Sequence, residues 1–419
     1  MERLAIVGGR PLTGSVRVHG AKNAALPILA ASVLAAGKST ITDVPDLKDI
    51  RVMSQILESL GAKVSIEGRT AQVDSSTIHT FEVPEEMMRQ MRSSIFLMGP
   101  ILARFGTVRV SKPGGCTIGS RPIDLHLKGL KALGANIEEK GGYIQCTTER
   151  LRGDHIYLDI PSVGTTENLM MAATLAEGTT TIGNAAREPE IVDLARFLNK
   201  MGAKISGAGE DTITIQGVEE LRPTRHTIIP DRIVAGTFLL AGAITRGDIR
   251  LINVIPGHLG VVLTKLREAG VEIKVDRDII NVRSRGELRA VDRIQTAPYP
   301  GFPTDLQAPF MSLLTIAKGS SIVSETIFEE RFKHVSELRR MGANIKVDLR
   351  TAFVQGVSEL TAASVEASDL RAGAALVIAA LAAKGVTHIT GLQHIDRGYE
   401  RIEDVLNSLG ARAWRIKSG

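Results

Sequence analysis

The chain has 419 residues, of which 43% are hydrophobic and 23% are charged, so it is long enough for two globular domains of about 200 residues each. Lysine and arginine exceed aspartate and glutamate by 51 to 46, a small excess that suits an anionic small-molecule substrate. Dispersed basic residues and an aromatic content of 4% argue against a nucleic-acid partner, because no stacking platform is present.

Membrane and secretion signals are not apparent in the sequence. No run of 18 apolar residues occurs, and the first residues lack the apolar stretch of a signal peptide. Two cysteines, Cys116 and Cys146, are too few for a disulfide framework and suit a reducing compartment. We therefore expect a cytoplasmic protein without a membrane partner.

One pattern recurs six times along the chain: a helical run that ends in Leu/Met-Gly-Ala, or a close relative, and an alternating segment after it. The central glycines are Gly61, Gly134, Gly202, Gly270, Gly342 and Gly410, at intervals of 73, 68, 68, 72 and 68 residues. Before each of them, an Ala/Leu-rich run stops at another glycine and a β-branched segment follows. We expect these earlier glycines to be helix C-caps, and they are Gly37, Gly106, Gly178, Gly247, Gly319 and Gly385. Each repeat thus reads βαβαββ.

The sixth repeat is short, because only residues 412–419 follow its Leu-Gly-Ala motif. Residues 4–7 and 15–18 supply two strand-like segments before the first helix begins near Lys22. We therefore expect one domain of residues 22–229 and a second of residues 1–21 with 230–419, three repeats each. The helices near 24–36 and 372–383 are apolar on nearly all sides, which predicts helices buried inside sheets.

Polar residues occur where the apolar helix of each repeat begins. They are Lys22 with Asn23, Arg92, Ser162 to Thr165, Asp231 with Arg232, Asp305, and Asp369 with Arg371. Ordinary helix capping accounts for Ser162, Asp305 and Asp369. It does not account for the cations, which oppose the positive end of the helix dipole. If such helix starts from both domains face one cleft, they would bind phosphate or carboxylate groups there.

The segment 111–126 places three glycines and a proline around Cys116, and Arg121-Pro122 then begin a helix. The two landmark glycines are 28 residues apart in this repeat and 23 to 25 apart in the others. The extra residues fall in the cysteine loop, which favours a working thiol over a surface loop with an incidental cysteine. Cys146 lies in an alternating segment and is expected to be a strand residue. No cluster has metal-ligand spacing, so no metal is expected.

Four segments, 20–27, 113–122, 302–305 and 396–399, closely resemble motifs of the UDP-N-acetylglucosamine enolpyruvyl transferases, and the resemblance covers the whole chain. It implies a pair of inside-out α/β barrels with the active site in the interdomain cleft. It also implies transfer of the enolpyruvyl group of phosphoenolpyruvate to the 3'-hydroxyl of UDP-N-acetylglucosamine, with phosphate released through a tetrahedral intermediate. This is the first committed step of peptidoglycan synthesis. No cofactor is implied, the partners are the two substrates, and we expect a monomer.

The resemblance assigns roles to individual residues. Cys116 matches the proton donor to phosphoenolpyruvate, which also holds that substrate as a covalent adduct, and Asp305 matches the candidate base at the sugar 3'-hydroxyl. Lys22, Asn23 and Arg397 match phosphoenolpyruvate contacts. Nucleotide-sugar contacts are matched by Arg92, Arg121, Pro122, Ile123, Asp124, Leu125, by Ser162, Val163 and Gly164 near the diphosphate, and by Ile327 near the acetamido group. Polar residues of the substrate cleft are matched by Arg331, Asp369 and Arg371.

Three positions depart from common forms of the family. Ile160 replaces a lysine, Tyr299 a histidine and Glu330 an asparagine, and Glu330 would weaken anion binding or pair with Arg331. Two alternatives stay open: a 5-enolpyruvylshikimate-3-phosphate synthase, which lacks the cysteine loop, and a non-catalytic paralogue that binds nucleotide sugars. A repeat-built interaction protein is disfavoured, because these repeats are long and closed by the chain terminus.

Overall fold

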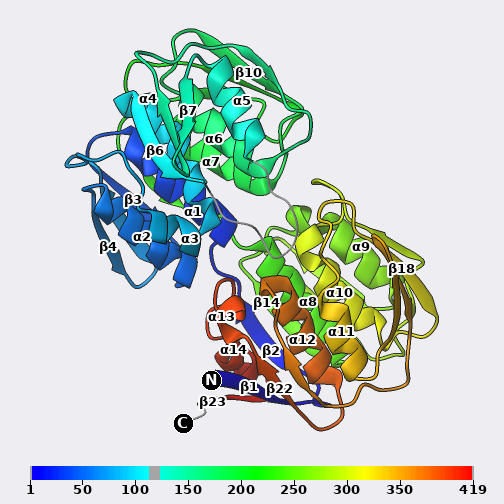
Figure 1. Ribbon diagram of the computed structural model, residues 1–419. Helices are drawn as coiled ribbons and strands as arrows, with labels where there is room; N and C mark the ends of the chain where they lie inside the picture. The colour runs from blue at the N-terminus through cyan, green and yellow to red at the C-terminus, as the bar shows by residue number, and fades with distance from the viewer. Residues whose placement is uncertain (1, 113–122, 418–419) are drawn as a thin grey trace. The chain divides into compact units, whose positions relative to one another are not determined.

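The computed structural model describes residues 2–112 and 123–417 (Figure 1). The predicted site residues Cys116, Arg121 and Pro122 lie outside these ranges, and of Arg92 only the backbone is described. In the described ranges the chain divides into two compact units. Residues 19–112 and 123–229 form the N-terminal unit, and residues 2–18 and 230–417 form the C-terminal unit. The expected active site in a cleft between two domains stays a prediction.

Three βαβαββ repeats can be followed through the N-terminal unit. Its helices are α1 (Lys22–Ala31), η1 (Ser32–Leu34), α2 (Lys48–Ser59), α3 (Glu85–Gln90), η2 (Arg92–Leu97), α4 (Met98–Phe105), α5 (Asp124–Ala132), α6 (Val163–Ala173) and α7 (Pro189–Lys200). Its strands are β3 (Lys38–Thr42), β4 (Lys63–Glu67), β5 (Thr70–Asp74), β6 (Thr107–Ser111), β7 (Asn136–Lys140), β8 (Tyr143–Thr147), β9 (His155–Tyr157), β10 (Thr179–Gly183), β11 (Lys204–Ser206), β12 (Thr212–Gln216) and β13 (Arg225–Thr227).

The C-terminal unit repeats this plan and adds the first two strands of the chain. Its helices are α8 (Arg232–Ile244), η3 (Pro256–Leu259), α9 (Gly260–Glu268), η4 (Thr304–Leu306), α10 (Gln307–Leu314), α11 (His334–Arg340), α12 (Leu370–Ala382), α13 (Leu392–Ile395) and α14 (Ile402–Ser408). Its strands are β1 (Glu2–Val7), β2 (Thr13–Arg17), β14 (Asp248–Ile252), β15 (Glu272–Asp276), β16 (Ile279–Arg283), β17 (Arg293–Gln295), β18 (Ser320–Ser324), β19 (Asn344–Asp348), β20 (Thr351–Gln355), β21 (Ser364–Glu366), β22 (Val386–Thr390) and β23 (Arg412–Lys417).

The described strands form six small sheets of one design. In the sheet β17-β18-β20-β19, the hairpin β19-β20 pairs antiparallel with the central strand β18, and β17 lies parallel on its other side. Four other sheets have the same order of positions, and the sheet β6-β8-β7 has an isolated bridge between Glu82 and Arg109 in the fourth place. The repeating sheet agrees with the βαβαββ pattern expected from the sequence.

The apolar helices lie inside the sheets. All eight residues of α10 are buried, as are nine of the ten in α1 and eleven of the thirteen in α12. Helices α8, α10 and α12 pack side by side in the C-terminal unit, as Figure 1 shows. Because neighbouring helices and sheets surround each of them, their residues are apolar on every face. The predicted burial of these helices is confirmed. No helix in the described ranges is both long and apolar enough to cross a membrane.

The Leu-Gly-Ala motif ends a helix in all six repeats. Its glycines have φ between 88° and 107°, a left-handed conformation that favours glycine. The amide of the next residue donates to a carbonyl five positions back, as from Ala62 to Leu57 and from Ala343 to Leu338. This bond satisfies a helix-end carbonyl in the Schellman manner. The regular spacing of these glycines in the sequence therefore reflects the same backbone turn at the end of a helix in each repeat.

The prediction for the other six glycines is largely wrong. Gly106 is the C-cap of α4, with φ 74°, but the other apolar helices end two or more residues before their glycine. Hydroxyls explain the early end in several copies: Thr174, Thr245 and Thr315 each donate to a carbonyl three or four residues back. The helix-end carbonyl is thus satisfied before the glycine is reached.

Both ends of the chain contribute strands to the C-terminal unit. Strand β1 lies between β22 and β23 and pairs antiparallel with both, and β2 lies parallel to β14. In the N-terminal unit the equivalent place beside β3 is taken by β13. Each unit thus takes the outer strand of one sheet from the segment that leads into or out of the other unit.

Candidate active site

Asp305 is held by two arginines in the C-terminal unit. Arg331 Nη2 donates to Asp305 Oδ1 at 2.5 Å, and Arg371 Nη2 donates to Oδ2 at 2.7 Å. The arginine side chains are 4% and 9% exposed, whereas that of Asp305 is 25% exposed. The carboxylate is therefore held by two buried cations and stays partly exposed to solvent.

Asp305 does not cap a helix, unlike Asp369 and Ser162. Asp369 caps α12, since its Oδ1 accepts from the amides of Arg371 at 2.9 Å and Ala372 at 3.1 Å. Ser162 caps α6 by accepting from the amide of Thr165. Asp305 instead lies within η4, where no side chain caps the first turn. Capping thus explains two of the three residues, and the capping interpretation of Asp305 is wrong.

Arg371 stays a cation although it is buried. Burial alone would lower the pKa of its guanidinium, but the charge of Asp305, the proximity of Tyr399 and the hydrogen bond to Asp305 outweigh that effect and raise the pKa above its ordinary value. Tyr399 is also buried, which raises its pKa, and its hydroxyl is hydrogen-bonded to that of Thr237 at 2.8 Å. A buried polar layer therefore supports the Asp305 carboxylate from behind.

Lys22 begins α1 of the N-terminal unit, as the sequence predicts. Its Nζ lies 3.2 Å from Asp49 Oδ2, and Asp49 is itself buried in the first turn of α2. A cation at a helix start favours a negatively charged group beside it. For Lys22, the Asp49 carboxylate supplies part of this negative charge. Asp49 was not predicted, because one sequence does not reveal which acidic residue of α2 faces α1. Asn23, the next residue, is exposed.

Asn168 joins three segments predicted to contact the nucleotide sugar. Its Oδ1 accepts from the amide of Gly99 at 2.6 Å, while Nδ2 donates to the carbonyl of Ile95 at 3.2 Å and to His126 Nδ1 at 3.0 Å. These bonds tie together η2, which begins with Arg92, helix α5 and helix α6. The signal that sequence reasoning missed is the run of four polar residues, Thr165 to Asn168, in a helix that is buried.

The remaining predicted residues lie near these elements. Around α5, Ile123 and Leu125 are half-buried and Asp124 is exposed. At the start of α6, Val163 and Gly164 are half-buried. In the C-terminal unit, Ile327 and Arg397 are half-buried. The structure brings Asp305, Arg331 and Arg371 into one cluster and joins the η2, α5 and α6 segments in another.

The position before Arg397 is firmly held. Arg415, on β23, donates to both carboxylate oxygens of Asp396 at 2.9 and 2.6 Å and to Glu403 at 2.7 Å. A bidentate pair of this kind fixes orientation as well as distance. The turn that carries Arg397 is thus attached to the sheet β21-β22-β1-β23 of its unit.

The three departures from the family pattern do not disturb the Asp305 cluster. Glu330 pairs with Lys333 at 2.6 Å, while Arg331 pairs with Asp305, so the alternative in which Glu330 pairs with Arg331 is wrong. Tyr299 lies 5.7 Å from the guanidinium of Arg232, an aromatic contact with another helix-start cation. Ile160 is 62% exposed.

Cys146 does not compete with Cys116 as a working thiol. It is fully buried in β8, as expected of a strand residue, and burial raises the pKa of its thiol to about 12. A thiol with that pKa is protonated near neutral pH and is a poor nucleophile. Among the described residues, no group of three or more histidine, cysteine, aspartate and glutamate side chains could hold a metal ion.

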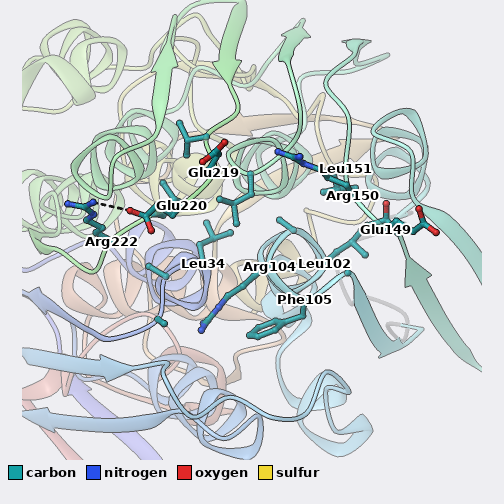
Figure 2. Close-up of a pocket in the computed structure, with 18 of the residues that line it drawn as sticks. Leu34, Leu102, Arg104, Phe105, Glu149, Arg150, Leu151, Glu219, Glu220 and Arg222 are labelled. Atoms are coloured by element: carbon teal, nitrogen blue, oxygen red, sulfur yellow. Dashed lines mark hydrogen bonds and ion pairs between the residues drawn. The ribbon is translucent and has the colours of Figure 1, made fainter.

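An open hollow of about 830 Å³ in the N-terminal unit is unrelated to the predicted site (Figure 2). It lies at the C-terminal ends of the apolar helices, where Leu34, Leu102 and Leu151 form part of its wall. None of the predicted site residues that the structure describes lines it. Arginines and glutamates both line it, and Arg222 is paired with Glu220 at 2.9 Å.

His334, behind Arg331, makes the stability of the protein depend on pH. Burial and the charge of Arg331 outweigh Asp369 and lower its pKa from 6.5 to about 4. Between these pH values the unfolded chain binds a proton that the folded protein does not. Stability is therefore full above pH 6.5 and falls by about 3 kcal/mol as the pH is lowered to 4.

Denaturant unfolding at pH 7 and pH 4 measures this dependence. His334→Asn is expected to flatten the pH dependence, whereas His79→Asn, at an exposed histidine, should leave it as in the wild type. Parallel wild-type and His334→Asn curves would contradict the assignment.

Comparison with known proteins shows the family of this chain. The family model of EPSP synthase (3-phosphoshikimate 1-carboxyvinyltransferase) matches residues 6–406. UDP-N-acetylglucosamine 1-carboxyvinyltransferase 2 of Caldanaerobacter subterraneus is 56% identical over 416 residues, which cover 99% of this chain and all of the relative. UDP-N-acetylglucosamine 1-carboxyvinyltransferase of Desulfosudis oleivorans is 53% identical, with the same coverage of both chains.

Solved structures agree on the fold. The enolpyruvyl transferase NikO from Streptomyces tendae has a TM-score of 0.89 at 27% identity and covers 100% of this chain and 99% of its own. EPSP synthase from Acinetobacter baumannii has a TM-score of 0.78 at 17% identity and covers both chains fully, so it informs on the fold alone. The predicted inside-out α/β barrel fold is confirmed. The chain belongs to the UDP-N-acetylglucosamine 1-carboxyvinyltransferases, within the wider EPSP synthase family of enolpyruvyl transferases.

Proposed function

We propose that this protein transfers the enolpyruvyl group of phosphoenolpyruvate to the 3'-hydroxyl of UDP-N-acetylglucosamine and releases phosphate, as the first committed step of peptidoglycan synthesis. The observation that carries the proposal is the Asp305 carboxylate, partly exposed and held by two buried arginines. It supplies an oriented acceptor for a hydroxyl proton beside cations that suit an anionic substrate.

The reaction consists of an addition and an elimination. In the addition, the 3'-oxygen bonds to C2 of phosphoenolpyruvate while a proton is delivered to its methylene carbon, which gives a tetrahedral intermediate. In the elimination, the C2–O bond to phosphate breaks and the new methyl group loses a proton, which restores the double bond. Cys116 is proposed as the proton donor, in accord with the resemblance of its loop.

Asp305 is proposed as the base that accepts the proton of the 3'-hydroxyl. Each of its oxygens already accepts one arginine bond, and a carboxylate oxygen has a second lone pair for a substrate hydroxyl. Because both arginines are largely buried, the carboxylate is held in one orientation before substrate arrives. Positioning rather than strong basicity is therefore its main contribution.

The two units are proposed to contribute different parts of the binding site. In the N-terminal unit, Lys22 and Asn23 are proposed to bind phosphoenolpyruvate, and the segments joined by Asn168 the nucleotide sugar. In the C-terminal unit, Arg397 is proposed to bind phosphoenolpyruvate and Ile327 to contact the acetamido group. Since one chain supplies all of these residues, a monomer is sufficient. We propose that the enzyme acts in the cytoplasm, where its substrates are made.

The first experiment measures phosphate release from phosphoenolpyruvate by the full-length protein. UDP-N-acetylglucosamine and shikimate 3-phosphate are compared as acceptors, with wild type and Cys116→Ser in parallel. Release only with the nucleotide sugar, reduced by about 10²-fold or more in the variant, is expected if a placed proton donor is lost.

The other outcomes distinguish the alternatives. Release with shikimate 3-phosphate would identify an EPSP synthase instead. Binding of UDP-N-acetylglucosamine by folded protein without phosphate release would identify a non-catalytic paralogue. Full activity of Cys116→Ser would remove the thiol from the mechanism while leaving the reaction in place.

A further inference from the structure

Glu325 is a buried carboxylate that the proposed reaction does not use. It follows strand β18 and is 1% exposed. Its Oε1 accepts from the amides of Ile327 at 2.8 Å and Phe328 at 3.1 Å and from the hydroxyl of Thr296 at 3.0 Å. Its Oε2 accepts from the hydroxyl of Thr304 at 2.9 Å. Four donors thus compensate the cost of burying this charge.

These bonds join two segments that carry predicted substrate contacts. Thr304 immediately precedes Asp305 in η4, and Ile327 follows Glu325 by two residues. Arg331, in the same loop as Ile327, returns to Asp305 through the 2.5 Å pair. The contacts form a closed ring from Glu325 through Thr304, Asp305 and Arg331 and back along the loop. A change at Glu325 therefore displaces the Asp305 segment relative to the amides near Ile327.

We infer that Glu325 is a positioning residue that sets the spacing between the Asp305 carboxylate and the loop at Ile327. The inference rests on the proposed function, in which Asp305 meets the sugar 3'-hydroxyl and Ile327 the acetamido group. In N-acetylglucosamine these groups are on adjacent ring carbons, C3 and C2. One sugar ring thus has to match both protein contacts at once, and Glu325 fixes the distance between them.

The inference predicts an effect on the choice of acceptor as well as on rate. With the spacing intact, the acetamido contact helps to place the 3'-hydroxyl against Asp305. When the spacing is lost, that contact no longer assists the reaction. The preference for UDP-N-acetylglucosamine over UDP-glucose, which has a hydroxyl in place of the acetamido group, should then decrease.

The test compares kcat and KM for UDP-N-acetylglucosamine and UDP-glucose in four variants of the full-length protein. Glu325→Ala removes all four bonds, and Thr304→Val removes only the bond beside Asp305. Both should lower kcat by at least about 10-fold with the natural acceptor and reduce the ratio of kcat/KM between the two acceptors by a similar factor. Glu325→Gln keeps one carbonyl oxygen for the two amides and should stay within about 3-fold of wild type.

Thr326→Val is the matched control. The Thr326 hydroxyl donates to the carbonyl of Thr296 at 2.6 Å in the same loop, but not to Glu325. This variant should keep the wild-type acceptor ratio. If Glu325→Ala does not fold, Thr304→Val carries the test.

Two results would overturn the inference: a wild-type acceptor ratio in folded Thr304→Val, or an equal loss of the ratio in Thr326→Val. Absence of transfer by the wild-type protein would instead refute the proposed function, so the two failures are distinguishable.

Discussion

Asp305→Asn is expected to lower kcat by about 10³-fold, the largest effect of any substitution among the described residues. An amide does not accept a proton from the sugar hydroxyl. Its NH2 group also faces one of the two guanidiniums that now donate to the carboxylate, and two donors cannot bond to each other. Steady-state rates of phosphate release measure the loss, and binding of UDP-N-acetylglucosamine by calorimetry tests whether the site is retained.

The matched control is Asp248→Asn in the same unit. Asp248 pairs with Arg283 at 2.6 Å on the sheet of β14 and β16, where both side chains are partly exposed. Its loss is expected to leave kcat unchanged, because exposed pairs contribute little and this one is outside the Asp305 cluster. Asp305→Asn with more than a tenth of the wild-type kcat would exclude Asp305 as the base.

Asn168→Ala is expected to destabilise the N-terminal unit by about 3 kcal/mol and to raise the KM for UDP-N-acetylglucosamine by about 10-fold. The substitution removes the hydrogen bonds from Asn168 to the amide of Gly99, the carbonyl of Ile95 and the imidazole of His126. The segments that begin with Arg92, Asp124 and Val163 would then shift independently of one another. Thermal unfolding and acceptor-dependent kinetics measure the two effects.

Asn199→Ala separates lost stability from lost positioning. Asn199 bonds the amide and carbonyl of Ile205, each at 2.9 Å, in the same unit but away from the three segments. It should destabilise the protein while the KM stays as in the wild type. If both asparagine variants raise the KM equally, the Asn168 bonds have no special part in acceptor binding.

The repeats were predictable because local backbone chemistry leaves a mark in the sequence. A left-handed turn after a helix favours glycine, so Gly61 and its five equivalents recur at regular intervals. The buried helices were predictable from their apolar residues on every face. The ends of these helices were not, because the hydroxyls of Thr174, Thr245 and Thr315 satisfy carbonyls before the glycine. Nothing in the spacing distinguishes a glycine at the cap from one a few residues later.

The sequence predicted which residues belong to the candidate site better than it predicted the contacts between them. Lys22, Asp305 and Arg371 are marked by their positions at helix starts or by family motifs. Their partnerships depend on tertiary packing: Asp305 pairs with Arg371 from the next repeat, and Lys22 with Asp49 from the next helix. A single sequence shows which residues share one face of a helix. It does not show which neighbouring element that face contacts. Buried polar residues that only support others, such as Glu325, therefore escape sequence reasoning.

The place of β1 between β22 and β23 bears on how the protein is made. Residues Leu4 and Ile6 are buried only when strands from residues 386–417 have joined them. A ribosome adding about 5–20 residues per second needs about 20–80 s to synthesise the intervening chain. The N-terminal unit, which ends at Ile229, is already complete by then. During synthesis the first strand therefore stays without its partner strands until the end of the chain has been made, and its apolar residues cannot be buried in their native place before then.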